Sequence, residues 1–172
     1  MNKIYFSLFL FLILSQLQGQ VLSPNVLANG DFTKGKAGWQ GEGRIVKIKE
    51  GKENTEGNPA LVINLDKKKE QSFHCLAEIP KGTKSVKLSF KILTSEDYEV
   101  QESQPLITIL RAGTAQYDAL IRRQALEKQV EWQEKRASIS PIATERMGIV
   151  VTIRPGKGKV YFDDLVAEAR AD

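Results

Sequence analysis

A strict alternation of apolar and polar residues over positions 85–93 is the feature that most constrains the fold of this chain. Val86, Leu88, Phe90 and Ile92 occupy every second position, and polar residues stand between them. Side chains of a β-strand point alternately to its two faces, so this period of two predicts a strand with one buried face. An amphipathic helix would instead repeat its apolar positions every three or four residues.

Further short apolar or alternating segments recur along the chain, and clusters of glycine, proline and asparagine separate them. Such clusters are typical of turns between strands. We expect strands over residues 25–32, 44–49, 60–65, 71–79, 106–110, 115–123, 130–139, 147–153 and 159–167. Residues 115–130 would also suit a helix, but the alternation of Tyr117, Ala119 and Ile121 favours a strand. About ten short strands predict an all-β fold, an antiparallel β-sandwich of the jelly-roll type.

The first and last of these segments are expected to lie side by side. Residues 25–39 read N-V-L-A-N-G-D-F-T-K-G-K-A-G-W, a short strand that runs into an Asn-Gly-Asp turn. Residues 158–168 read G-K-V-Y-F-D-D-L-V-A-E, a strand with two aspartates near its middle. Pairing of the two strands would cover sheet edges that could otherwise recruit another chain.

Residues 1–19 have the features of a secretory signal peptide. Lys3 gives a positive start, and residues 4–14 form an almost unbroken apolar run. This run is shorter than the roughly 20 residues that a membrane span needs, and no later segment is long and apolar enough. We therefore expect a signal peptide over residues 1–19, one domain over residues 20–172, no membrane span after signal removal, and a secreted or periplasmic protein.

Charge and the two rarest side chains exclude several classes of function. The net charge of +4 is mild and spread along the chain, so we expect no nucleic-acid partner. Cys75 is the one cysteine and lies on the apolar face of segment 71–79, which predicts a small buried side chain. His74 is the one histidine and points to the opposite face, so a Cys-His or Ser-His catalytic pair and a zinc site are poorly supported.

Four motifs follow one another in an order that resembles a known family. They are N-V-L-A-N-G-D-F with G-W, I-P-K-G-T before S-V-K-L-S-F-K, E-W-Q-E-K-R-A-S-I, and G-K-V-Y-F-D-D-L-V. Together they resemble the carbohydrate-binding modules of the family four and nine type, which share the galactose-binding-like jelly roll. The resemblance covers residues 25–168. It implies a fold with a concave sheet face and a non-catalytic protein whose partner is a poly- or oligosaccharide, bound on that face or at the loop rim.

An alternative function class stays open. The same fold could serve as an extracellular or envelope protein that binds another protein, or has a structural role, without binding sugar. The sequence leaves the oligomeric state undetermined.

Sugar binding needs a flat apolar surface for the face of the ring and polar side chains for its hydroxyl groups. Tyr98 and Tyr117 lie in or beside expected loops and are the candidate ring platforms. Arg111, Asp118 and Arg122 stand near Tyr117 in the sequence and are the candidate hydrogen-bonding residues. The alternative is that all of these residues are ordinary solvated surface residues without a role in binding.

Two tryptophans and one strand face are further candidates for the same role. Trp39 and Trp132 match tryptophans of the family that serve mostly in the core, so we predict a packing role for both. The outward face of segment 85–93 offers Lys87, Ser89 and Lys91. A sugar with anionic groups would suit such lysines and the nearby arginines.

The resemblance also implies a candidate structural calcium ion near the chain ends, and no other cofactor. Calcium prefers about six to eight oxygen ligands. Asp31 in the first turn and Asp163 or Asp164 on the last strand would converge if those two segments are neighbours. Thr33 stands where the family often has a glutamate, which weakens the site.

We expect no catalytic activity. Glycoside hydrolases use a pair of carboxyl groups that flank the scissile bond. Asp163 and Asp164 are such a pair in sequence only, because adjacent residues of a strand point to opposite faces.

Overall fold

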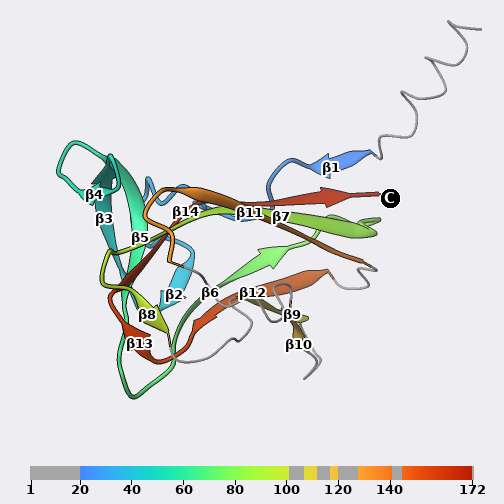
Figure 1. Cartoon of the computed structure of the whole chain (residues 1–172). Coiled ribbons are helices and arrows are strands. Elements are labelled where there is room, and N and C mark those ends of the chain that lie inside the picture. The colour runs from blue at the N-terminus through green and yellow to red at the C-terminus, as the bar shows by residue number, and fades with distance from the viewer. Residues whose placement is uncertain (1–19, 101–106, 112–116, 120–127, 141–144, 172) are drawn as a thin grey trace, which may run out of the picture.

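The computed structural model describes residues 20–100, 107–111, 117–119, 128–140 and 145–171. Within these ranges every regular element is a β-strand. Figure 1 shows two sheets packed face to face, with a small two-stranded sheet at one end of the sandwich. All pairings between neighbouring strands are antiparallel. The predicted all-β sandwich is confirmed.

The larger sheet has seven strands. Its order is β11 (Gln133–Ile139), β7 (Ser85–Thr94), β14 (Lys159–Arg170), β5 (Asn58–Asn64), β3 (Arg44–Lys49) and β4 (Lys52–Glu53), and β1 (Val21–Ser23) pairs with β14. Strand β14 is the longest. It pairs with β7 both before and after a register irregularity between Asp163 and Val166, with β5 near its start, and with β1 near its end. This strand therefore connects the two halves of the sheet.

The smaller main sheet has five strands. Its order is β10 (Tyr117–Ala119), β9 (Ile107–Arg111), β12 (Arg146–Ile153), β6 (Gln71–Glu78) and β2 (Trp39–Gly41). Strands β8 (Glu99–Val100) and β13 (Gly156–Lys157) form the separate two-stranded sheet at the end of the sandwich.

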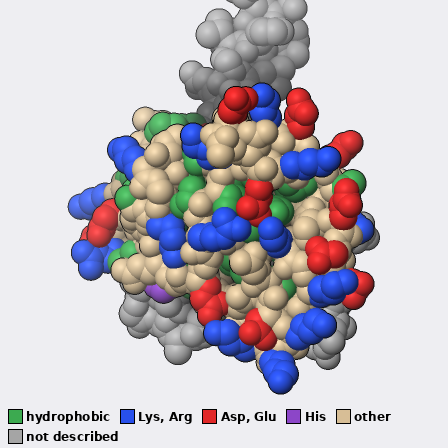
Figure 2. All heavy atoms as spheres, turned by 90° about the vertical axis from the view of Figure 1, so that its left-hand side faces the viewer, with side chains coloured by type: hydrophobic (Ala, Val, Ile, Leu, Met, Phe, Trp, Pro, Cys, Tyr) green, Lys and Arg blue, Asp and Glu red, His purple; other side chains and the backbone are tan. Residues whose placement is uncertain are grey.

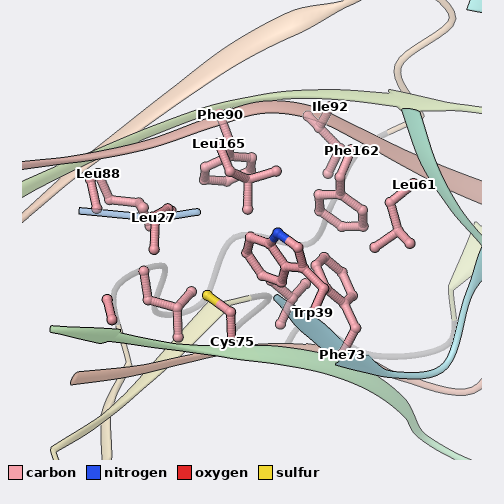
Figure 3. Packing of buried hydrophobic residues seen from close by; sticks show 14 of the residues in the cluster. Leu27, Trp39, Leu61, Phe73, Cys75, Leu88, Phe90, Ile92, Phe162 and Leu165 are labelled. Atoms are coloured by element: carbon pink, nitrogen blue, oxygen red, sulfur yellow. The ribbon is translucent and has the colours of Figure 1, made fainter. Parts of the chain in front are cut away.

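The core lies between the two sheets, as the alternation in the sequence predicts. Trp39, Phe73, Phe162 and Phe90 form a continuous row of aromatic rings with centroids 5.3–6.3 Å apart. Figure 3 shows these rings together with Leu27, Leu61, Cys75, Leu88, Ile92 and Leu165. Trp39 is only 4% exposed, which confirms its predicted packing role. Burial of this much apolar surface is the main source of stability for a chain without a disulfide.

A second, smaller apolar cluster lies on the other face of the seven-stranded sheet. It contains Val46, Ile48, Ala60, Val62, Leu93 and Tyr161. Trp132 is partly buried and packs against it, so this tryptophan also packs, although outside the main core. The segment before β11 reaches this cluster because Gln129 and Thr94 exchange hydrogen bonds of 2.7–3.2 Å.

The two ends of the domain meet, but residues 25–32 do not form the strand that the sequence predicts. The Val26 amide donates a 2.8 Å hydrogen bond to the Ala167 carbonyl, so the segment does lie beside β14. Asn29 and Phe32 adopt positive φ angles of 58° and 54°, which extended strands exclude. The Asn29 side chain stabilises the turn by bonding the backbone of Lys34, Gly35 and Ala37.

Most other strand predictions are confirmed to within a few residues, and β3 matches to the residue. Of the predicted strand over 115–123, residues 117–119 form β10 and the rest lies outside the described residues. Between the predicted strands 44–49 and 60–65, the structure has one further short strand, β4. Within the described ranges, no helix is long and apolar enough to cross a membrane. Figure 2 shows basic and acidic side chains interspersed over the side of the molecule that carries β3, β4 and β5.

Candidate functional site

The outer face of the five-stranded sheet carries the most distinctive combination of side chains. In β6, Phe73, Cys75 and Ala77 point into the core and are buried. His74, Leu76 and Glu78 alternate with them and are exposed, so they face solvent on the other side of the sheet. The prediction that Cys75 is buried and His74 lies on the opposite face is confirmed. Burial raises the pKa of the Cys75 thiol to about 12, so the reactive thiolate is absent at neutral pH.

Leu76 is 64% exposed, although it lies in the middle of a strand. Its partner across the pairing of β6 with β12 is Gly148, which has no side chain. Single exposed leucines are common on protein surfaces and need no explanation by themselves. Leu76 is of interest because hydrogen-bonding side chains surround it.

Those polar neighbours come from three adjacent strands. His74 is the register partner of Gln40 in β2 and of Val150 in β12. Glu78 lies opposite Arg146, whose Nε donates a 2.8 Å hydrogen bond to Glu78 Oε1. An amide, an imidazole, a guanidinium and a carboxylate thus surround one apolar side chain. This is the arrangement that a ligand with an apolar face and a polar rim requires.

Strands β9 and β10 extend this sheet and bring three of the predicted site residues to it. Through the pairings, Leu76, Gly148, Leu110 and Tyr117 form one row across four strands. Tyr117 therefore shares a row with the exposed leucine.

The other two predicted residues on these strands lie in different rows. Asp118 is opposite Ile109, in the row of the buried Ile149, and Arg111 is opposite Met147. Arg111, Tyr117 and Asp118 thus reach one edge of the sheet. Arg122 lies outside the described residues.

Tyr98 does not lie in an exposed loop as the sequence predicts. Its side chain belongs to the core cluster and is 6% exposed. A tight turn places it there, because the Tyr98 amide donates a 3.1 Å hydrogen bond to the Ser95 carbonyl, and the backbone of Gly158 packs against Tyr98. The hydroxyl is buried and has no hydrogen-bond partner among the described residues, and burial raises its pKa to about 12.

The three aspartates considered as calcium ligands lie near one another, beside the junction of the chain ends. Burial raises the pKa of Asp163 to about 6, and the neighbouring charges of Asp164 and Asp31 act in the same direction. Asp164 adopts a φ of 51° in the irregular part of β14, so the simple alternation expected for this pair does not hold there. Its Oδ2 forms a 2.8 Å ion pair with Lys91 Nζ.

The residues present do not fit a hard divalent cation. Asp31 Oδ1 accepts bonds from the amide and hydroxyl of Thr33, and Asp163 Oδ1 accepts one from the Asp164 amide. Lys91 already supplies a positive charge to Asp164. In the described part of the chain, no group of three or more His, Cys, Asp or Glu side chains is arranged to hold a metal.

Sequence reasoning did not propose Gln40, Leu76, Glu78 or Arg146 for the site. A signal for them existed in segment 71–79, where Leu76 is an apolar residue on the polar side of the alternation. Arg146 and Gln40 carried no such signal, because their proximity depends on which strands become neighbours.

Comparison with known proteins gives a consistent result for the fold. No family model and no curated protein matches the sequence. The structure resembles TmCBM61, solved in complex with β-1,4-galactotriose, with a TM-score of 0.59 and 19% identity over 84% of this chain and 98% of that one. It also resembles the CBM22-1 xylan-binding domain from Paenibacillus barcinonensis, with a TM-score of 0.54 and 12% identity over 90% and 97% of the two chains.

A third similar structure is that of a CBM4 module, with a TM-score of 0.54 and 16% identity over 84% of this chain and 99% of that one. These matches extend over nearly the whole of each solved domain, so they compare complete folds. The chain has the β-sandwich jelly-roll fold of the carbohydrate-binding modules.

Proposed function

We propose that this protein binds a poly- or oligosaccharide, without cleaving it, on the outer face of its five-stranded sheet. The observation that carries the proposal is the exposed Leu76 among the polar side chains of three adjacent strands. A sugar ring has one apolar face and a rim of hydroxyl groups. It therefore gains from an apolar contact flanked by hydrogen-bonding groups.

The residues divide into two roles. Leu76, together with Tyr117 in the same cross-strand row, would supply the apolar surface for the ring. His74, Gln40, and the paired Glu78 and Arg146 would bond hydroxyl groups. Arg111 and Asp118 share rows with the buried Met147 and Ile149, so they are not assigned to this face, and Arg122 stays a prediction from the sequence. Tyr98 is buried and would act through packing.

Similar structures support a neutral, β-linked oligosaccharide as the ligand. One of them was solved with β-1,4-galactotriose and another is described as xylan-binding. Binding without catalysis is proposed because Glu78 is already held by Arg146, whereas glycoside hydrolysis needs two carboxyl groups across the bond.

We further propose that residues 1–19 act as a signal peptide and that the domain works outside the cytoplasm. Polysaccharides that such a surface would meet occur outside cells. N-terminal sequencing of the protein from an exporting host would test this, and an intact Met1 in the exported fraction would contradict cleavage.

A glycan array followed by isothermal titration would test the binding site. The variants are Leu76→Ser and Tyr117→Ala, and the matched control is Val130→Ser. Val130 is also a highly exposed hydrophobic residue, at 57%, but lies outside this sheet. We expect each site variant to weaken binding of β-1,4-galactotriose or xylan oligosaccharides by about tenfold, the effect of losing one apolar contact, and the control to bind like the wild type.

Two results would contradict the proposal. Equal affinity of Leu76→Ser and the wild type would place the ligand elsewhere. Absence of any glycan hit on the array would favour the alternative, a jelly roll that binds protein or has a structural role.

A further inference from the structure

A trough on the opposite side of the molecule has the features of a second ligand site. It has a volume of about 480 Å³, within the usual range of ligand pockets, and lies on the outer face of the seven-stranded sheet. Its lining residues come from β7, β11 and β14: Lys87, Leu88, Ser89, Glu134, Arg136, Ala137, Ser138 and Glu168.

The register of the strands explains the shape of this trough. Lys87 stands directly between Ser138 on β11 and Glu168 on β14, and Ser89 stands beside Arg136. Leu88 is buried in the core below, so it contributes its backbone to the floor. The two short serine side chains lie between longer charged side chains, and this difference in length leaves the hollow.

The ion pairs of the trough leave one of its cations without a carboxylate partner. Arg136 donates two hydrogen bonds of 2.9 Å to Glu134, and Arg170 forms an ion pair with Glu168. Both carboxylates of the trough are therefore neutralised by arginines. Lys87 has no ion pair or hydrogen bond with another residue of the described ranges, and neither have the hydroxyls of Ser89 and Ser138.

These three groups form a compact triangle. Directly opposite residues on adjacent antiparallel strands lie about 5 Å apart, and second neighbours along a strand about 7 Å apart. The ammonium and the two hydroxyls of residues so closely spaced can contact the carboxylate or sulfate and the hydroxyls of a single sugar ring. Among the described residues, no aromatic side chain lines the trough, so these residues offer no stacking surface for a neutral ring.

We propose that this trough binds an acidic sugar residue, with the anionic group on Lys87 and hydroxyl groups on Ser89 and Ser138. It would be a second site, on the sheet opposite the proposed neutral-glycan face. Because its residues belong to β7, β11 and β14, it does not depend on the function proposed for β6 and β12. A molecule with both sites could bridge two chemically different glycan chains.

The test is a titration of the ¹⁵N-labelled protein with trigalacturonate, and separately with neutral β-1,4-galactotriose, at low salt. We expect trigalacturonate to shift the amide signals of Lys87, Ser89, Arg136 and Ser138. Lys87→Gln should weaken this binding about tenfold, as expected for loss of a hydrogen bond to a charged group. Added salt should weaken it as well. Lys84→Gln, which changes an exposed lysine just outside the trough, should bind like the wild type.

Three results would overturn the inference. One is unchanged amide signals in β7 and β11 at millimolar trigalacturonate. Another is equal affinity of Lys87→Gln and the wild type, and a third is an equal response of the trough to neutral galactotriose. If trigalacturonate shifts only signals of β6 and β12, the second site is absent while the function proposed for the five-stranded sheet stands.

Discussion

The Leu165 amide donates a 2.9 Å hydrogen bond to the carbonyl of Gly30, and this contact holds the first turn of the domain against its last strand. The two backbones approach so closely that a Cβ atom at position 30 would lie 1.8 Å from the Leu165 carbonyl oxygen. Gly30 does not have a positive φ angle, so backbone conformation does not explain the glycine. Lack of space for a Cβ atom does.

Gly30→Ala is therefore expected to destabilise the domain strongly, by about 3 kcal/mol or more, because backbone must move on one side of the contact. Gly35→Ala is the control. Gly35 has a φ of 64° and nothing near its missing Cβ, so alanine there costs about 1 kcal/mol of backbone strain only. Urea unfolding of both variants gives the comparison. If both variants lose the same free energy of unfolding, the backbone near Gly30 must shift at little cost to make room for the Cβ atom.

Alternation predicts this fold well where a strand has one buried and one solvated face. Segments 71–79, 85–93 and 147–153 became β6, β7 and β12 because every second side chain meets the core. The predicted strand over residues 25–32 is wrong because local hydrogen bonds outweigh the apolar composition of this segment. The predicted Asn-Gly-Asp turn is present, and Asn29 holds it by bonding three nearby backbone groups, but the apolar residues before it do not form a strand.

The candidate site was predictable only in part, because it depends on contacts between distant segments. Tyr117 does share a row with Leu76, which sequence reasoning could not foresee. The residues next to Tyr98 in the sequence are mostly polar, which indicates an exposed loop. In the structure the turn at Ser95 and the backbone of Gly158 bury this side chain. Burial of this kind is a tertiary property.

Removal of divalent metal should leave the stability of the protein unchanged. The oxygens of Asp31, Asp163 and Asp164 already accept protein hydrogen bonds or an ion pair, so no cage for calcium is formed. Thermal unfolding in excess EDTA and in millimolar calcium should give the same Tm. A Tm that falls in EDTA and returns with calcium would show that these side chains rearrange around an ion.

Glu53 connects β4 to the rest of the seven-stranded sheet and should contribute a small, pH-dependent stability. It bonds Lys159 at 2.7 Å and Arg44 at 3.1 Å, and Tyr161 donates its hydroxyl at 3.3 Å. Hydrogen bonds from Lys159 lower the pKa of Glu53 below its ordinary value of 4.5. Because the group is partly exposed, Glu53→Gln is expected to lose about 0.5–1 kcal/mol near pH 7.

The pH dependence of that difference follows from the lowered pKa. The stabilisation is complete above the unfolded-state value of 4.5 and is lost as the pH falls through the lower pKa of the folded state. Urea unfolding at pH 3 to 7 should show the wild type and Glu53→Gln converging at the acid end. Glu56→Gln, which removes a much more exposed partner of Lys49, should differ little from the wild type at any pH. If the difference in free energy of unfolding between the wild type and Glu53→Gln stays constant over this pH range, the ionised carboxylate of Glu53 is not the source of the stabilisation.

Asp163 should act in the opposite direction, because its folded-state pKa of about 6 lies above its ordinary value of 3.8. The folded protein binds a proton more tightly than the unfolded chain, so stability falls as the pH rises from about 4 to 6 and the penalty persists above pH 6. Asp163→Asn keeps an oxygen for the Asp164 amide but cannot ionise. Allowing for solvent screening, we expect it to gain about 1 kcal/mol at pH 7.5 and nothing at pH 4. A variant with the same stability profile as the wild type from pH 4 to 8 would show that the buried carboxylate ionises without cost, and that Lys91 fully compensates the charges of both aspartates.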